Sequence, residues 1–112
     1  MAAFRAVYST RFVGHKGLDV AAPTGYLVPA GFVAVVRQAD VYIGGPTVGD
    51  EELFLQLLPD GWTFVEWSVQ SSPNPFSGHW SGRVVFNAGE EFGFKSNVGT
   101  WDVHCSGYLL AS

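Results

Sequence analysis

The sequence predicts an all-β fold, an antiparallel β-sandwich of the jelly-roll type with seven or eight strands in a single domain over residues 1–112. Three observations predict it. Fourteen glycines and six prolines divide the chain into short apolar segments, as turns divide the strands of a sandwich. Most segments alternate apolar and polar residues, which indicates sheets with one covered face. Helix-forming stretches are scarce. Sheets of this kind pack against a second sheet or close on themselves, so a small barrel is the alternative.

The expected strands are separated by turns that contain glycine or proline. In chain order they span residues 3–12, 26–28, 32–43, 53–58, 62–70, 80–87, 92–94 and 101–110. Residues 14–25 are expected to form a loop. Residues 71–76 are expected to form a second, irregular loop, because its two prolines cannot donate ladder hydrogen bonds.

Alternation supports the first and the longest of these strands. In the first strand, Phe4, Ala6 and Tyr8 share one face. In the longest strand, residues 32–43, the odd positions face one way and are apolar with one exception, an arginine. These positions are Val33, Val35, Arg37, Ala39, Val41 and Ile43.

Residues 50–58 are the one serious candidate for a helix, because they begin with a cap-like Gly-Asp-Glu-Glu run. However, Leu53, Leu55 and Leu57 alternate, and Pro59 ends the segment, so a strand is favoured. The last two long strands also carry inward-facing residues at alternate positions. These residues are Trp80, Val84 and Phe86, followed by Trp101, Val103, Cys105 and Leu109.

Composition excludes several classes of protein. Only 14% of the residues are charged and 15% are aromatic, which excludes intrinsic disorder. The formal net charge is −4 and the six basic residues are scattered, so neither nucleic acid nor a membrane surface is an expected partner. No apolar stretch approaches the roughly 20 residues of a membrane helix, and the first residues lack the apolar part of a signal peptide. The single cysteine permits no internal disulfide, which fits a reducing cytoplasm.

No catalytic, cofactor-binding or metal site is predicted. The three histidines, His15, His79 and His104, lack the spacing of a metal-binding motif, although a site assembled in space stays open. Adjacent strand residues point to opposite faces, so His104 cannot activate Cys105 as a nucleophile. Cys105 is expected to be a small core residue instead.

Two arginines interrupt strands. A central arginine in a sheet normally pairs with a carboxylate, and Asp40, Glu66 and Asp102 are available to Arg37. Arg83 is expected to point outward into solvent.

Several aromatic residues are expected on the outward faces of their strands. They are Phe32, Tyr42, Trp62, Phe64 and Tyr108. Aromatic side chains are enriched in subunit contacts, so these residues are the candidates for an interface between copies of the chain. The alternative is a curved barrel that covers both faces of its strands.

Three segments carry a resemblance to a known group of proteins. They are Tyr26-Leu-Val-Pro-Ala-Gly-Phe-Val-Ala-Val-Val-Arg37, Trp80-Ser-Gly-Arg-Val-Val-Phe-Asn-Ala-Gly-Glu90 and Ser106-Gly-Tyr-Leu-Leu110. The first resembles the "VPAG" turn and valine-rich strand of small virion structural proteins of tailed phages, most readily phages of actinobacteria. The second resembles a "W-x-GR-x-V" strand of the same proteins, and the third is similar to their closing strand. The resemblance implies a minor tail or head-decoration protein that forms symmetric homo-oligomers, and it brings no catalytic residues with it.

These observations predict a non-enzymatic virion protein, made in the host cytoplasm, without cofactors. It is expected to bind itself, with a trimer favoured, and other virion proteins of the capsid or tail. A carbohydrate-binding β-sandwich is the alternative, with Asn74, Phe76, His79 and Trp80 as the candidate glycan contacts. A small jelly-roll enzyme is a third possibility, and it would need a metal.

Overall fold

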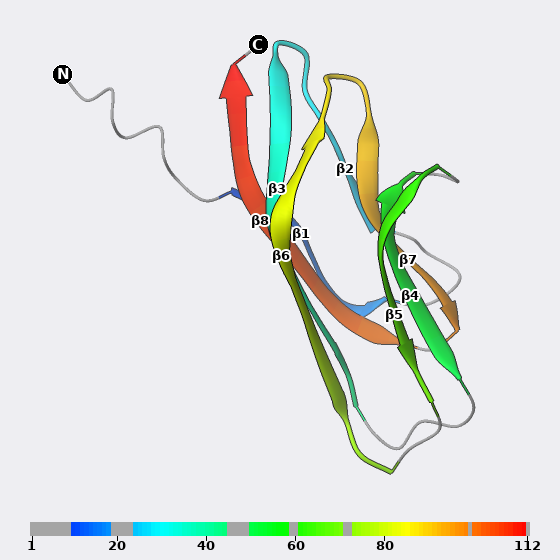
Figure 1. The fold of residues 1–112 in the computed structure, drawn as a ribbon. Coiled ribbons are helices and arrows are strands. Elements are labelled where there is room, and N and C mark those ends of the chain that lie inside the picture. The colour runs from blue at the N-terminus through cyan, green and yellow to red at the C-terminus, as the bar shows by residue number, and fades with distance from the viewer. Residues whose placement is uncertain are drawn as a thin grey trace, which may run out of the picture.

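The computed structural model describes residues 10–18, 24–44, 50–58, 61–70, 73–98 and 100–111. These residues form eight strands in two sheets that face each other (Figure 1). The strands are β1 (Thr10–Leu18), β2 (Thr24–Leu27), β3 (Phe32–Ile43), β4 (Glu51–Leu57), β5 (Thr63–Val69), β6 (Phe76–Phe86), β7 (Glu91–Val98) and β8 (Trp101–Ala111). The predicted all-β sandwich is confirmed.

The order of the strands is that of a jelly roll. One sheet, sheet A, has the order β1-β8-β3-β6, and the other, sheet B, has the order β2-β7-β4-β5. Every pairing between described strands is antiparallel. The chain passes from one sheet to the other at most of its turns, so neighbours within a sheet are mostly distant in sequence. Two open sheets form in place of the alternative closed barrel.

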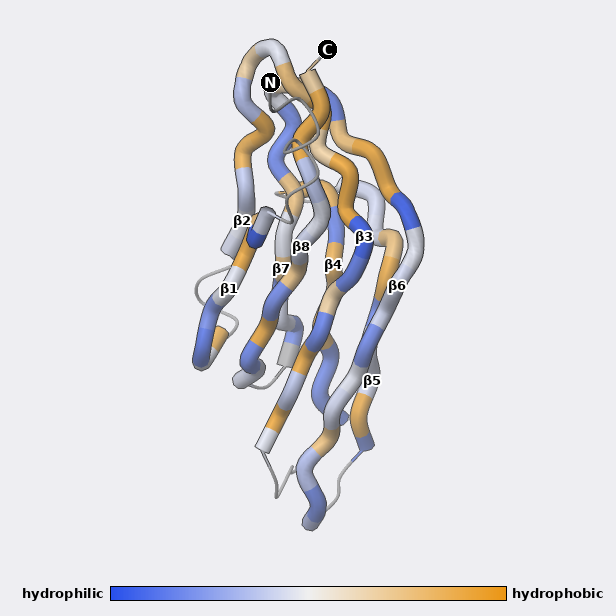
Figure 2. The backbone as a smooth tube through the Cα atoms, turned by 90° about the vertical axis from the view of Figure 1, so that its left-hand side faces the viewer, coloured by the Kyte–Doolittle hydropathy of each residue, from blue (hydrophilic) through white to orange (hydrophobic). Residues whose placement is uncertain are grey.

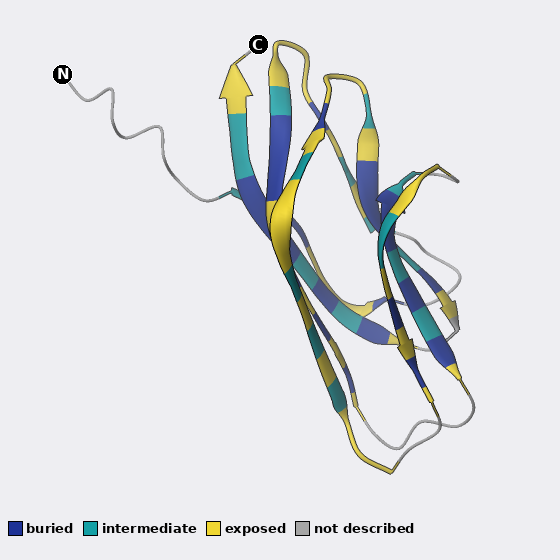
Figure 3. Cartoon of the chain, in the orientation of Figure 1, coloured by how far each residue is buried: buried dark blue, intermediate teal, exposed yellow. Residues whose placement is uncertain are grey.

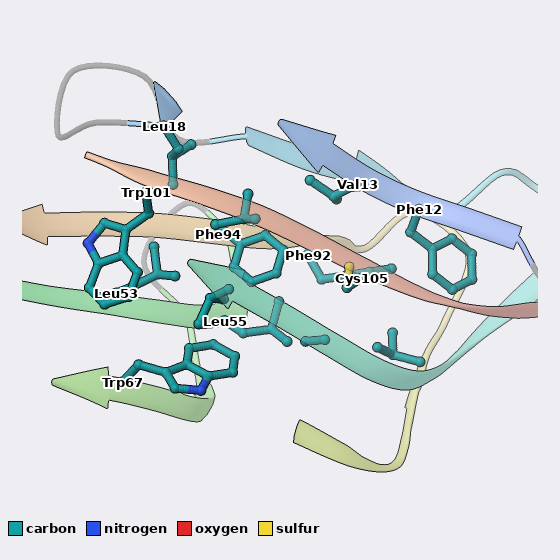
Figure 4. Close-up of a cluster of buried hydrophobic side chains, with 14 of the residues drawn as sticks. Phe12, Val13, Leu18, Leu53, Leu55, Trp67, Phe92, Phe94, Trp101 and Cys105 are labelled. Atoms are coloured by element: carbon teal, nitrogen blue, oxygen red, sulfur yellow. The ribbon is translucent and has the colours of Figure 1, made fainter. Parts of the chain in front are cut away.

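The core lies between the two sheets and is rich in aromatic residues (Figure 4). Trp101, Phe92 and Phe94 have no exposed surface. The ring of Phe92 stacks on Phe86 with centroids 4.4 Å apart and meets the edge of Phe12 at 5.3 Å. Each such buried side chain stabilises the fold by roughly 1.5–3 kcal/mol, so this aromatic layer holds the two sheets together.

An irregularity at Arg37 reverses the inward face of β3. Val36 lies opposite Gly107 of β8, whereas the next pair is Gln38 with Ser106, so Arg37 is an extra residue in β3. A bulge of this kind shifts the side-chain alternation by one position. Ala34 and Val36 therefore face the core before the bulge, and Ala39 and Val41 face it afterwards.

The bulge corrects part of the expected pattern. Ala39, Val41 and Ile43 face the core as expected, but Val33 and Val35 lie on the opposite, outer face of sheet A. Val35 is nevertheless only 1% exposed, because the neighbouring strands place Val85 and Tyr108 on either side of it. The sequence contains no residue that signals this bulge, since arginine has no backbone preference for one.

Other boundaries also differ from those expected. Residues 14–18 belong to β1 and pair with β8, and β2 begins at Thr24, so the expected loop over residues 14–25 is wrong at both ends. The strand expected at residues 80–87 begins earlier, at Phe76, and the strand expected at residues 92–94 continues to Val98. The strand preferred over a helix at residues 50–58 is confirmed as β4. Residues 3–9 of the first expected strand lie outside the described residues.

Candidate functional site

The outer face of sheet A carries two distinct groups of side chains, one apolar and one polar. Figure 2 shows hydrophobic stretches on β3 and β6 near the C-terminus and hydrophilic stretches farther along both strands. The first group is here called the apolar end and the second the polar face. Both follow from the strand register, because side chains two residues apart in a strand point the same way.

The apolar end forms where β3 begins and β6 and β8 end. It consists of Val33, Val35, Val85, Tyr108 and Leu110. Val33 lies opposite Leu110, and Val35 lies between Tyr108 and Val85. Leu110 and Val85 are 45% and 47% exposed, and Figure 3 shows the exposed ends of β8 and β6 side by side with β3. Two of the six large, exposed hydrophobic side chains of the described residues therefore lie here.

The polar face consists of six side chains in two rows. One row is His79, Asp40 and His104, and the other is Ser77, Tyr42 and Asp102. Each row crosses β6, β3 and β8 in that order, with directly opposed residues. Neighbouring strands are about 4.8 Å apart and alternate residues about 7 Å apart, so all six side chains share one compact patch. An open depression of about 370 Å³ lies over five of them, Asp40, Tyr42, Ser77, Asp102 and His104.

Asp40 is the centre of the first row. Its Oδ1 lies 2.7 Å from Nδ1 of His79, and its Oδ2 lies 4.0 Å from Nδ1 of His104. A carboxylate can only accept hydrogen bonds, so Nδ1 of His79 is the donor. In the second row, Oδ1 of Asp102 accepts a hydrogen bond of 3.0 Å from the backbone N–H of Gly17.

The cysteine next to this face does not contribute a nucleophile to it. Cys105 lies on the opposite side of β8 from His104, as expected, and has no exposed surface. Burial raises the pKa of the Cys105 thiol to about 12, and a hydrogen bond with the backbone of Val13 offsets this only in part. The thiol is therefore protonated at neutral pH and cannot act as a nucleophile.

The structure brings two of the three histidines together. His79 and His104 flank Asp40, whereas His15 lies on β1 opposite Val103. Within the ranges that the structure describes, no group of three or more histidine, cysteine or acidic side chains has the geometry of a metal site. The polar face is thus described as a hydrogen-bonding surface.

Arg37 is not paired with a carboxylate as expected. It is exposed, and its Nε donates a hydrogen bond of 2.8 Å to the carbonyl oxygen of Gly82. Because Arg37 is the extra residue of the bulge, its side chain reaches the backbone of β6 at the place where that strand is also irregular. The carboxylate of Asp40, one of its expected partners, is bonded to His79 instead. Arg83 is exposed, as expected.

The five expected interface residues occupy four separate places. Tyr108 belongs to the apolar end, and Tyr42, which is 43% exposed, belongs to the polar face. Phe32 is 38% exposed, but its expected outward orientation is wrong, because the bulge in β3 puts it on the same side of sheet A as Ala34. Trp62 and Phe64 lie at β5, which is the edge of sheet B. Trp62 is 63% exposed and stacks on Phe64, with ring centroids 5.6 Å apart.

Phe64 does not have the outward orientation that alternation predicts. Leu55 lies opposite Val65 and Gln56 lies opposite Thr63, which leaves Phe64 as an extra residue in β5. Its half-buried ring turns toward the other sheet and contacts the rings of Trp80 and Phe86 at 5.8 and 5.4 Å. Phe64 therefore closes the edge of the sandwich between β5 and β6.

The four expected glycan contacts do not form one surface. Phe76 and Trp80 are half-buried and pack against the core, where Phe76 meets the edge of Trp101 at 6.3 Å. His79 points to the opposite side of β6, and the exposed Asn74 precedes the strand. The reason is that β6 begins at Phe76, so strand alternation separates residues that a loop could have brought together.

Sequence reasoning missed the aliphatic members of the apolar end and the acidic members of the polar face. Val33, Val85 and Leu110 had no distinguishing signal, because exposed and buried aliphatic residues look alike in sequence. Asp40 and Asp102 were considered only as partners of Arg37. The odd-even alternation around Tyr42 could have placed Asp40 beside it on one face.

The described residues contain no helix that is long and apolar enough to cross a membrane. Comparison of the sequence with protein-family models and with curated proteins finds no match.

Proposed function

We propose that the protein is a non-enzymatic structural component of a tailed-phage virion, a minor tail or capsid-decoration protein. It acts through contacts between copies of itself, with a trimer as the favoured assembly, and through contacts with other virion proteins. The apolar end of sheet A is the single observation that supports this proposal most strongly. The three-segment resemblance to phage virion proteins supports the same class.

The physical argument concerns the cost of exposing apolar surface. Each square ångström of apolar surface that leaves water stabilises an assembly by about 25 cal/mol. Val85 and Leu110 expose large apolar side chains on the same face at one end of sheet A, on either side of Val33 and Val35 of β3. Contiguous exposed apolar surface of this kind marks interaction sites, and most soluble homo-oligomers have closed symmetry.

A pair of matched leucine variants tests the interface. Leu110→Asp places a charge in the apolar end, whereas Leu27→Asp places the same charge on β2, where the leucine is 63% exposed. Size-exclusion chromatography with light scattering should show an oligomer for the unmodified protein and for Leu27→Asp, and a monomer for Leu110→Asp. An equal effect of the two changes, or none from either, would contradict the proposed interface.

The place in a virion needs a separate test. Antibodies raised against the protein should label intact, purified particles of the phage that encodes it, at regular positions on the head or tail. Labelling of infected-cell lysate without any labelling of purified particles would contradict the virion role, even if the protein is an oligomer.

A further inference from the structure

We propose that the polar face of sheet A binds a saccharide unit, a hydroxyl-rich ring that stacks on Tyr42 and hydrogen-bonds to the side chains around it. This binding site is separate from the proposed assembly surface. It also differs from the glycan site expected at residues 74–80, since only Ser77 and His79 of that range belong to it.

The register supplies the platform. Tyr42 lies between Ser77 on β6 and Asp102 on β8, and its side chain is exposed. Its aromatic ring offers a flat apolar surface near the end of β3, where a paired strand lies on each side. Aromatic side chains combine such a surface with a polar tip, which suits a ligand with apolar C–H faces and polar edges.

The residues around Tyr42 supply both kinds of hydrogen-bonding group. The carboxylates of Asp40 and Asp102 accept hydrogen bonds, and the hydroxyl groups of Tyr42 and Ser77 donate and accept them. Asp40 holds the ring of His79 at 2.7 Å, so that Nε2 of that ring is directed away from the carboxylate. Sugar hydroxyl groups are donors and acceptors at once, and a mixed set of partners satisfies both roles.

The depression over these residues favours a small polar ligand over a protein surface or a cation. Its volume is about 370 Å³, at the lower end of the range of roughly 300–1,000 Å³ for small-molecule sites. No lysine or arginine of the described residues lines it, and the donor geometry of a metal site is missing from the described residues. A basic peptide could contact the two carboxylates, but it would leave the donors of Tyr42 and Ser77 without a role.

A second depression on the outer face of sheet B is a weaker candidate. Its volume is about 190 Å³, and Gln56, Thr63 and Asn97 contribute to its lining. These groups already bond within the protein, since Thr63 donates to Gln56 at 3.2 Å and Asn97 donates to Glu52 at 3.3 Å. A ligand there would have to replace existing hydrogen bonds, whereas Tyr42 presents an exposed ring.

The test uses the full chain and four methyl glycosides, those of glucose, galactose, N-acetylglucosamine and rhamnose. Two-dimensional NMR spectra recorded during titration should show shifts of the Tyr42, Ser77 and His104 backbone amides with at least one glycoside. Tyr42→Ala should weaken binding by about tenfold or more, as expected for loss of a stacking platform, whereas Tyr42→Phe should retain the ring and most of the affinity.

Trp62→Ala is the matched control, because it removes an exposed aromatic ring at another edge and should leave binding unchanged. Leu110→Asp should also leave binding unchanged, which separates this site from the proposed assembly surface. Arginine ethyl ester serves as the probe for a basic partner. The proposal is overturned if no glycoside shifts these amides, if the shifts centre on Trp62, or if only arginine ethyl ester shifts the polar face.

Discussion

Asp40 of β3 and His79 of β6 lie directly opposite each other on the outer face of sheet A, with Oδ1 and Nδ1 2.7 Å apart. The two residues are 39 positions apart in the chain. The contact depends on the bulge at Arg37, because this extra residue changes which side chains of β3 point outward. A local irregularity of the backbone thus decides the composition of the proposed binding surface.

The Asp40–His79 pair should orient its groups without adding much stability. Both side chains are at least half exposed, and exposed ion pairs contribute roughly 0–1 kcal/mol. Asp40→Asn should therefore change the free energy of unfolding in urea by less than about 1 kcal/mol. The nitrogen shifts of the His79 ring should change, because an amide can donate to Nδ1 where a carboxylate cannot. Unchanged ring shifts would contradict the described hydrogen bond.

The aromatic layer should be the main source of stability. Phe92→Ala removes a ring that has no exposed surface and contacts Phe86 and Phe12, so it should cost about 3–5 kcal/mol. Trp62→Ala removes a larger but mostly exposed ring and should cost about 1 kcal/mol or less. Urea unfolding monitored by circular dichroism measures both changes. A larger loss for Trp62→Ala than for Phe92→Ala would contradict the described core.

Gly107 should be intolerant of any side chain. A Cβ atom at this position would collide with the carbonyl oxygen of Val35, and a backbone atom within a ladder cannot move aside cheaply. Gly107→Ala should therefore destabilise the protein by about 1–3 kcal/mol.

Gly14→Ala is the matched control for this change. Its Cβ would lie 3.0 Å from Cδ of Arg11, which belongs to a flexible side chain, so the cost should stay near about 0.5 kcal/mol. Thermal unfolding of the two variants decides the matter, and equal losses would show that β8 and β3 do not approach as closely as described.

Cys105 should resist modification and should make stability fall at alkaline pH. Its pKa is about 12 in the folded protein, against 9.0 for an exposed thiol. Between pH 9 and pH 12 the thiol of the unfolded chain loses its proton, whereas the thiol of the folded protein keeps it. The contribution of this thiol to the free energy of unfolding is therefore complete below pH 9 and is lost as the pH rises toward 12. The slope of the unfolding free energy against pH above 9 should be less steep in Cys105→Ala.

Thiol reagents give a second readout for the same residue. Iodoacetamide should label the protein in urea but not in its folded state, because the sulfur is buried and protonated. Rapid labelling of the folded protein would contradict the position of Cys105 in the core.

Strand alternation was sufficient to predict the sandwich and several of its inward faces. The alternation of side chains along a strand predicts that Leu53 and Leu55 point inward and that His104 and Cys105 point to opposite faces. Both predictions agree with the structure. Alternation failed where a strand contains an extra residue, as at Arg37 and Phe64, because neither arginine nor phenylalanine marks a bulge. In β3 the prediction assigns Val33 and Val35, before the bulge, to the wrong face, whereas Ala39, Val41 and Ile43 after it are correct.

The candidate surfaces could not be predicted from the sequence for a different reason. The polar face joins Asp40, His79 and His104, which come from three strands that are distant in the chain and adjacent in the sheet. Their assembly depends on strand order and on register, and neither can be read from one segment alone. The same holds for the apolar end, where Val85 and Leu110 meet only through β3.

Sedimentation equilibrium of the unmodified protein over a wide range of concentrations tests the central claim most directly, namely that copies of the chain cover the apolar end of sheet A. The monomer has a mass of 12.1 kDa. We expect a mass near three times that value, and a shift to the monomer mass for Leu110→Asp. A monomer mass for the unmodified protein at every concentration would contradict the claim.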